Sequence, residues 1–235
     1  PVNSLITCKR KLMSRNDSKE LWLNLEKEIQ PKTHELGRYT TQAYEDDPCA
    51  LSFITSRYKF CARMLSAAQT VIEIGCGDGF GSALVAQKVP RVICTDINES
   101  LLEENRSRMK SFSNIEFMYH DFRNEPFAEK VDGIYLVDVV EHIFKDEEES
   151  FLDNLCLSLK QHGVCVMGTP NKTSEQYASV FSREGHVNLK DYRELRELGE
   201  ERFFNHFIFG MNDEVVHTGF PEMAHFQWLV GIGPR

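Results

Sequence analysis

A run of alternate glycines follows a short apolar segment, and this is the first part of the sequence that could hold a ligand. Residues 70–75, TVIEIG, are apolar enough and short enough to be predicted as one buried strand. After Gly79 the apolar pattern becomes helical. A strand, a glycine loop and a helix start together let a ligand approach bare backbone amides. The stretch therefore predicts a site for a nucleotide-type cofactor, built around Glu73, Gly75, Cys76, Gly77 and Gly79.

Acidic and polar side chains also follow each later predicted strand. They are Asp96 with Ile97, Asp121 with Phe122, Asp138 with Glu141 and His142, and Asn171. In an open α/β sheet the ligand lies beyond the carboxyl ends of the strands, so these side chains should meet in one site. Asp96 lies about 20 residues beyond the glycines, which is the usual place for a carboxylate that holds both ribose hydroxyls. Asp121 is suited to an adenine amino group, and Phe122 to covering the ring.

The charge of these side chains favours one type of cofactor over another. Carboxylates around the pocket would repel a pyrophosphate, whereas they suit a sulfonium and an ammonium group. The dinucleotide pattern G-x-G-x-x-G would need glycine at position 80, where the sequence has Phe80. Both observations favour a cationic adenosyl cofactor without phosphates.

The pattern E-x-G-x-G-x-G at residues 73–79, with acids at successive strand ends, resembles the class I S-adenosylmethionine-dependent methyltransferases over residues 50–235. The resemblance implies that the glycines pass under the methionine part of S-adenosylmethionine, that Asp96 binds ribose and that Asp121 binds the adenine edge. It also implies that backbone near Asp138 approaches the methionine amino group, and that Arg57 reaches the cofactor carboxylate. The predicted cofactor set is Arg57, Glu73, Gly75, Cys76, Gly77, Gly79, Asp96, Ile97, Asp121, Phe122 and Asp138.

A narrower likeness concerns the acceptor. The stretches RYKFCARML, IGCGDGFGS, TPN, EGHVNL and MNDEVVHTGF resemble small-molecule methyltransferases of bacterial surface-polysaccharide (capsule and lipopolysaccharide) gene clusters. This resemblance implies a sugar, a nucleotide-linked intermediate or a small phosphorylated metabolite as acceptor, and it does not separate the three.

Candidate catalytic residues follow from the chemistry of methyl transfer. The reaction is an in-line displacement in which the protein mainly aligns the acceptor and excludes water. An oxygen or amide-type nitrogen acceptor also needs a base within hydrogen-bond reach. His142, after the fourth strand, is the first candidate, and His186 is the second. Glu141 is a candidate for positioning acceptor or cofactor. The simpler alternative is that His142 only caps or supports the next helix.

The sequence gives no reason to expect a bound metal. Adjacent residues on an extended chain point in opposite directions, so Glu141 and His142 should not share one ion. A metal site that joins His142 to Asp138 is the alternative. His120 is expected to face away from Asp121. The remaining histidines near the last strands are read as structural, although His217 is also a candidate for the acceptor pocket.

The elements that must position these residues alternate along the chain. Strands are predicted at 70–75, 92–96, 115–120, 131–137 and 164–168, with helices at 79–88, 100–110 and 146–161 between them. This alternation implies parallel strands joined by right-handed crossovers. The fold class is therefore α/β, a Rossmann-like, doubly wound, mostly parallel seven-stranded sheet. Two runs at 202–212 and 224–233 should close it as an antiparallel pair.

The remaining segments are predicted to surround this sheet. Residues 1–50 are interpreted as an N-terminal arm and helical lid, and residues 51–235 as the methyltransferase domain. Helices are expected at 19–30, ended by Pro31, and at 48–65, whereas 32–47 and 171–188 are expected to be irregular. Another helix at 189–198 should end at Gly199.

Composition narrows the setting in which the protein works. The net charge of −9 argues against a nucleic-acid partner, because phosphate binding needs a basic face. The seven cysteines are scattered, which fits free thiols in a reducing cytosol. No apolar run approaches the roughly 18 residues of a membrane span, and no secretory signal is present. We therefore expect a soluble cytoplasmic protein with a small-molecule substrate and no nucleic-acid or membrane partner; oligomeric state is not predicted.

Two other functions compete with methyl transfer. One is a nicotinamide-dependent oxidoreductase on a similar fold, against which Phe80 and the later acids count. The other is a non-catalytic S-adenosyl-binding protein, against which the intact glycine loop and Asp96 count.

Overall fold

The computed structural model describes residues 17–29 and 33–235, and the chain divides into two units, Pro1–Glu35 and Leu36–Arg235. In the first unit, helix α1 (Ser18–Glu26) begins at Asp17, whose carboxylate accepts a hydrogen bond from the Lys19 amide. The helix thus begins one residue before the predicted 19–30, at Ser18. The predictions for residues 1–16 and for Pro31 lie outside the described residues.

The second unit is built on one eight-stranded sheet of order β3-β2-β1-β4-β5-β8-β6-β7. The strands are β1 (Thr70–Ile74), β2 (Arg91–Asp96), β3 (Ile115–Tyr119), β4 (Val131–Val137), β5 (Leu159–Pro170), β6 (Phe203–Asn212), β7 (Val215–His217) and β8 (Phe226–Pro234). Strands β1 to β5 are parallel, whereas β8 runs antiparallel to both β5 and β6. The predicted mostly parallel sheet with a closing antiparallel pair is confirmed. The eighth strand is the short β7, which pairs with β6 in a segment that had been assigned to a connection.

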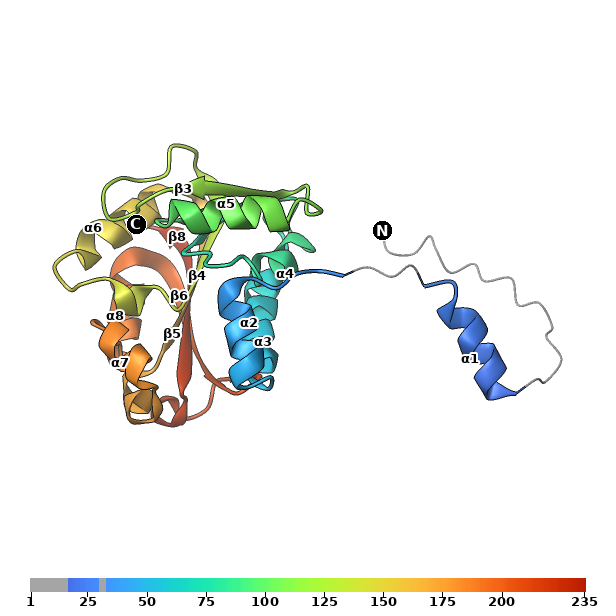
Figure 1. Cartoon of the computed structure of the whole chain (residues 1–235). Helices are drawn as coiled ribbons and strands as arrows, with labels where there is room; N and C mark the ends of the chain where they lie inside the picture. Colours follow the sequence, from blue (N-terminus) through green and yellow to red (C-terminus); the bar gives the residue numbers. More distant parts are fainter. Residues whose placement is uncertain (1–16, 30–32) are drawn as a thin grey trace. The chain divides into compact units, whose positions relative to one another are not determined.

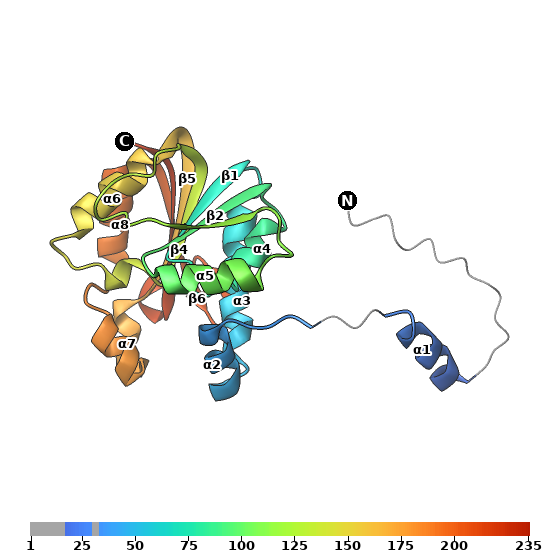
Figure 2. The same ribbon diagram turned by 45° about the horizontal axis from the view of Figure 1, so that its top comes forward.

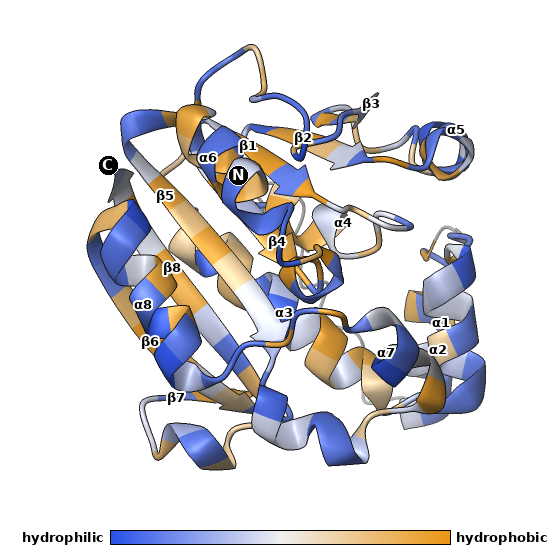
Figure 3. Ribbon diagram, turned by 90° about the vertical axis from the view of Figure 1, so that its left-hand side faces the viewer, coloured by the Kyte–Doolittle hydropathy of each residue, from blue (hydrophilic) through white to orange (hydrophobic). Residues whose placement is uncertain are grey.

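Helices cover both faces of the sheet (Figure 1). Side chains of α3 (Ala50–Met64), α4 (Ser82–Ala86) and α5 (Glu99–Arg108) pack in one hydrophobic cluster with β1 and β2. Side chains of α6 (Glu148–Leu157) and α8 (Tyr192–Arg202) pack in the other. Burial on both faces explains why the central strands are largely apolar, and much of their ribbon is orange in Figure 3.

Helix α2 (Arg38–Asp46) corrects the expectation that residues 32–47 are irregular. Its own N-cap, Gly37, provides no side chain. The carboxylate of Asp78, in the glycine loop, instead accepts hydrogen bonds from the Thr40 amide at 2.8 Å and the Thr40 hydroxyl at 3.1 Å. A β-carbon on Gly37 would lie 2.3 Å from Asp78. The helix start therefore depends on an acid 38 residues further along the chain, which no local pattern reveals.

Two elements differ from the predicted helix ends. The predicted helix at 146–161 ends earlier, because β5 already begins at Leu159. Gly199 lies inside α8, which begins later than expected, at an Asp191–Glu194 capping box, and continues to Arg202. A β-carbon on Gly199 would lie 2.7 Å from Leu229 of β8, so this glycine lets the helix pack closely on the sheet.

The segment expected to be irregular at 171–188 contains two short helices, η2 (Lys172–Tyr177) and α7 (Val180–Gly185). Figure 2 shows α7 and α2 beyond the same end of the sheet. In the described part of the chain, each helix is too short or too polar to cross a membrane. The six described cysteines are free thiols, as expected.

Candidate active site

Two adjoining cavities lie at the carboxyl ends of the parallel strands. The first, of about 380 Å³, is lined by Asp96, Ile97, His120, Asp121, Phe122, Arg123, Val139, His142, Ile143 and Phe151. The second, of about 290 Å³, is lined by Thr40, Ile54, Arg57, Tyr58, Cys76, Asp78, Phe80, Gly81 and Val137. Both cavities also share four lining residues: Tyr39, Gly75, Gly77 and Asp138. The site is therefore elongated, with the glycine loop and Asp138 at its middle.

The glycine loop has a backbone that other residues would strain. Gly75, Gly77 and Gly79 have φ angles of 70°, 53° and 69°. A β-carbon on Gly75 would lie 2.6 Å from a methyl group of Val139, on the loop after β4. Gly79 lines neither cavity, and its β-carbon would lie 2.9 Å from the Met109 sulfur. The structure thus assigns Gly79 to packing of the loop, not to the predicted ligand contact.

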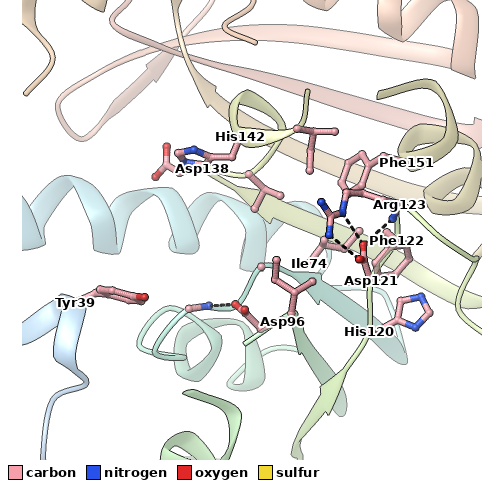
Figure 4. A pocket seen from close by; sticks show the side chains of 15 residues that line it. Tyr39, Ile74, Asp96, His120, Asp121, Phe122, Arg123, Asp138, His142 and Phe151 are labelled. Carbon is pink, nitrogen blue, oxygen red and sulfur yellow. Dashed lines mark hydrogen bonds and ion pairs between the residues drawn. The ribbon is translucent and has the colours of Figure 1, made fainter. Parts of the chain in front are cut away.

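Asp96 ends β2 beside this loop (Figure 4). Its Oδ2 accepts a hydrogen bond from the Gly77 amide at 3.0 Å, and its Oδ1 accepts one from the Asn98 amide at 2.9 Å. Each carboxylate oxygen retains lone-pair capacity toward the first cavity. Ile97 is 57% exposed and lies on the wall of the same cavity. The Asp96 carboxylate can accept hydrogen bonds from the hydroxyls of a ribose, and the Ile97 side chain can contact the edge of an apolar ring.

The far end of the first cavity is formed after β3. Phe122 is buried, and its ring contacts His120 with 4.4 Å between centroids. Asp121 is paired with Arg123 at 2.8 Å, and this guanidinium lowers the pKa of the carboxyl below its ordinary value. His120 lines the same cavity as Asp121, so the expectation that it faces away is wrong. The chain after β3 has left the strand, and the alternation of side chains no longer applies.

The second cavity carries an ion pair between Arg57 of α3 and Asp138. The Arg57 Nη1 atom lies 2.7 Å from Asp138 Oδ2, and the guanidinium stacks 3.8 Å from the centre of the Phe226 ring. Asp138 has a φ of 56°, which is rare for a residue other than glycine. Arg57 is held in place by these contacts and faces a cavity that also contains the glycine amides. This end of the site provides a cation for a ligand carboxylate and an acid for a ligand ammonium.

Glu73 lies beneath the loop, not in it. Its carboxyl lines neither cavity and accepts hydrogen bonds from the hydroxyls of Ser82 and Tyr135 and from the Cys94 thiol. Burial raises the pKa of this carboxyl to about 7, although those hydrogen bonds act in the opposite direction. The predicted cofactor contact of Glu73 is therefore corrected to support of the β1–loop–α4 turn from below.

The raised pKa of Glu73 predicts a pH-dependent stability. The folded carboxyl keeps its proton up to about pH 7, whereas the unfolded one loses it near its ordinary value of 4.5. The free energy of unfolding should thus fall as pH rises between 5.5 and 7, by about 1.5 kcal/mol from this group. In urea unfolding, the free energy of unfolding of Glu73→Gln should fall less over this pH range than that of the parent chain, by the same amount. The exposed control Glu129→Gln should show the same pH dependence as the parent chain. Parallel curves for Glu73→Gln and the parent would contradict the assignment.

The three candidate catalytic residues come together. Glu141 and His142 lie in the 3-10 turn η1 (Val140–His142), and His186 follows α7. The two imidazole centroids are 5.2 Å apart, and the Nδ1 atom of His142 lies 2.8 Å from the Gly185 carbonyl oxygen. Burial, reinforced by Asp138, raises the pKa of the Glu141 carboxyl to about 8. Burial, followed by repulsion from His142, lowers the pKa of the His186 imidazole.

This arrangement corrects the premise that Glu141 and His142 must diverge. The premise assumed extended chain, and the structure has a 3-10 turn there, in which successive side chains fan around an axis instead of alternating. Only His142 of the three lines the first cavity directly. Glu141 and His186 line neither cavity.

A buried ion pair anchors the segment that carries His186. Lys190 Nζ lies 2.5 Å from Glu148 of α6, and Asn188 donates a hydrogen bond to the same carboxylate at 2.9 Å. The Asn188 amide also donates to the carbonyl oxygen of Glu141 at 3.0 Å. Burial acts to raise the pKa of Glu148. Hydrogen bonds from Lys145 and Lys190 nevertheless hold this pKa below its ordinary value. Glu148, in the first turn of α6, therefore holds the segment that carries His186.

Some residues of the site were not predicted from the sequence, and some predicted residues lie elsewhere. Tyr39, on α2, was assigned to an irregular segment, and Arg123 carried no motif beyond its place two residues after Asp121. His217 is held by Asn212 and the Gly219 amide in a local turn and lines neither cavity. The Phe203–Phe209 segment is core only in part, because Phe204 and Phe207 are exposed.

The fold and the site together define a class of protein. A Rossmann-like sheet with a closing antiparallel pair, a glycine loop after β1 and an acid at the end of β2 are features of the class I methyltransferase fold. Solved structures agree: the methyltransferase domain of bacterial CtHen1-C has a TM-score of 0.64 at 16% identity, covering 77% of this chain and 99% of that one. The N-methyltransferase NodS from Bradyrhizobium japonicum, in complex with S-adenosylhomocysteine, has a TM-score of 0.58 at 20% identity, covering 77% and 87%.

Sequence comparisons identify the domain more closely. Residues 71–163 match the family described as a methyltransferase domain. A probable S-adenosylmethionine-dependent methyltransferase of Mycobacterium tuberculosis is 29% identical over 106 residues, 45% of this chain and 37% of that protein. Trans-aconitate 2-methyltransferase of Azoarcus is 28% identical over 137 residues, 55% of this chain and 52% of that enzyme. Residues 71–163 thus resemble a methyltransferase domain, and the chain spans only 37–40% of the length of the first mycobacterial relatives.

Proposed function

We propose that this protein transfers a methyl group from S-adenosylmethionine to an oxygen, or a nitrogen, of a small polar metabolite. The observation that carries the proposal is the elongated site, with an acid and an aromatic side chain at one end, Asp138 near the middle and its partner Arg57 at the other end. An adenosyl group and a charged amino-acid group need these two kinds of surroundings on either side of a glycine loop.

The residues present fit this cofactor. Asp96 is suited to the ribose hydroxyls and Asp121 with Phe122 to the adenine. Gly75 and Gly77 leave room for close approach of the ligand to the backbone. Arg57 and Asp138 are suited to the carboxylate and the ammonium of the methionine part. When bound, S-adenosylmethionine supplies a methyl group on a sulfonium, which leaves as the neutral thioether.

The protein's remaining task is to hold the acceptor and take its proton. The acceptor atom forms the new bond to carbon, and a hydroxyl or amide acceptor must release one proton to a base. His142 is our first choice, because its Nδ1 atom donates to the Gly185 carbonyl and leaves Nε2 free to accept a proton. His186 is second, and Glu141 would position the acceptor. We further propose that residues 36–50 and 171–188 act as a lid, of which α2 contributes Tyr39.

For the acceptor we propose an intermediate of surface-polysaccharide biosynthesis: a sugar, or a nucleotide-linked or phosphorylated metabolite. Support comes from the five sequence stretches that resemble such enzymes and from the polar groups around His142. The relatives differ in the acceptors that their names give, which include trans-aconitate and demethylmenaquinone. The acceptor must therefore be determined on this chain.

Calorimetric titration tests the cofactor, and a methylation screen tests the acceptor. We expect binding of S-adenosylmethionine and S-adenosylhomocysteine and none of NAD. Tight NAD binding without S-adenosyl binding would overturn the proposal in favour of an oxidoreductase. Free sugars, nucleotide-sugars and phosphorylated metabolites should then be screened with labelled S-adenosylmethionine. Transfer to none of the three, with the cofactor bound, would leave an S-adenosyl-binding protein and overturn the acceptor class.

Replacement of Asp96 by alanine should weaken S-adenosylhomocysteine binding by about 1–3 kcal/mol, because the ribose loses a charged partner. The matched control is Asp132→Ala. The Asp132 carboxylate also accepts two backbone hydrogen bonds, from Gln69 and Thr70, but at the opposite end of the sheet. Calorimetry should give near-parental affinity for the control. Equal affinities for both variants would remove Asp96 from the ribose role.

A further inference from the structure

We propose that Glu141, His142 and His186 form a binding site for one divalent transition-metal ion. The proposal goes beyond methyl transfer and rests on the geometry of this cluster, and it replaces the base role proposed for His142. Within the described residues, one candidate ligand atom from each of the three side chains lies within 4.8 Å of the other two. That spacing allows all three atoms to reach a single ion with small rotations of the side chains.

The carboxyl of Glu141 has an oxygen that needs a partner. The side chain is fully buried, and its Oε2 atom accepts a hydrogen bond from the Thr169 hydroxyl at 3.0 Å. The Oε1 atom is buried and has no hydrogen-bond partner. A buried polar atom left without a partner is costly. A cation bound between Oε1 and the two imidazoles satisfies this oxygen and displaces any proton that the carboxyl carries.

The orientation of His142 is that of a metal ligand. Because a carbonyl oxygen only accepts, the Nδ1 atom of His142 must carry the proton that bonds to Gly185. The lone pair therefore lies on Nε2. Metal-bound histidines usually donate their second ring nitrogen to a carbonyl or carboxylate in this way, which fixes tautomer and ring orientation. Gly185 immediately precedes His186, so one hydrogen bond links the two histidine-bearing segments.

A second set of contacts holds the cluster from outside. The Asn188 amide donates to the Glu141 carbonyl, and Asn188 and Lys190 both bind Glu148 of α6. The segment that carries His186 is thus fixed against the segment that carries Glu141 and His142. This preorganisation matters because an ion binds tightly only where its ligands are already close.

The donor set indicates the kind of metal. Two imidazole nitrogens and one carboxylate oxygen suit Mn²⁺, Fe²⁺, Co²⁺, Ni²⁺ or Zn²⁺, whereas Mg²⁺ and Ca²⁺ prefer oxygen donors alone. Three protein ligands leave coordination positions open toward the cavity that His142 lines. A bound ion takes the Nε2 lone pair of His142, so metal loading and a base role for His142 exclude each other.

Metal titration tests the site without any assay of activity. The purified chain, stripped with a chelator, should bind one Co²⁺ per molecule, with the d–d absorption of nitrogen and oxygen ligands, and should bind Mn²⁺ by loss of the free-ion paramagnetic resonance signal. Mg²⁺ should compete poorly. His186→Ala and His142→Ala should each weaken Co²⁺ binding at least tenfold, and Glu141→Gln should change the absorption spectrum.

The matched control is His162→Ala, which removes an exposed histidine from the start of β5, at the opposite end of that strand from the cluster. It should bind Co²⁺ as the parent chain does. Circular dichroism and thermal unfolding identify any variant that fails to fold, and Glu141→Gln, which preserves size, then remains as the test. Absence of one-to-one binding, or equal binding by His186→Ala and His162→Ala, would overturn the proposal.

Discussion

Alanine in place of Gly75 should weaken S-adenosylhomocysteine binding about a hundredfold. Gly75 has a φ of 70°, and alanine in this region of backbone space costs about 1–2 kcal/mol. Its β-carbon would also lie 2.6 Å from Val139, which adds a steric cost of similar size. Because Gly75 lines both cavities, relaxation of the loop would move the backbone into the space of the ligand. Calorimetry of the variant against the parent chain measures the loss.

A double-mutant cycle separates the two costs. Val139→Ala removes the methyl group that the new β-carbon would strike, so Gly75→Ala combined with Val139→Ala should recover part of the affinity that Gly75→Ala loses. The part that is not recovered is due to the backbone. Additive losses in the double variant would show that Val139 is not the obstacle. Affinity unchanged in Gly75→Ala itself would remove the loop from the cofactor site.

Replacement of Lys190 by methionine should lower the free energy of unfolding by about 3 kcal/mol. The lysine is 3% exposed, and its partner carboxylate on Glu148 is 9% exposed. Removal of one member of a buried pair leaves the other charge poorly compensated, which typically costs 3–5 kcal/mol. We place the loss at the lower end, because Lys145 and Asn188 still contact Glu148. Urea unfolding measures the change.

Lys145→Met provides a closely matched control. Lys145 binds the same carboxylate at 2.6 Å, but its side chain is 77% exposed, and exposed pairs contribute about 0–1 kcal/mol. Methionine at 190 combined with Glu148→Gln should regain part of the stability, since the uncompensated charge is gone. Similar losses for Lys145→Met and Lys190→Met would mean that burial of the pair is not what matters.

The sheet could be predicted because the burial of a strand is visible in the apolar residues of that strand. Residues buried on both faces form unbroken apolar runs, and the bounds of β4 agree with the predicted 131–137. Helix α2 could not be predicted in the same way. Its residues are mostly polar, and its first turn is held by Asp78, so part of the signal lies in a contact between distant residues.

The residues of the candidate site also differ in whether the sequence could predict them. Strand-end residues such as Asp96, Asp121 and Asp138 line one cavity, which the sequence could predict because position after a strand is visible in it. The depth of a side chain is not visible, and so Glu73 was placed among the cofactor contacts although it lies beneath the loop. The proximity of His186 to His142 was not derivable either, since it depends on how Lys190 and Asn188 attach one segment to another.

The bond from Asp78 to helix α2 has a consequence for rates. Tyr39 precedes Thr40, whose amide Asp78 holds, and its ring lines both cavities. Separation of this first helical turn from the loop would widen the site beside Tyr39. Local openings of this kind have their own free energies, distinct from that of global unfolding. We therefore expect the residence time of the cofactor to depend on residues 37–40, a segment that the glycine motif alone would not include.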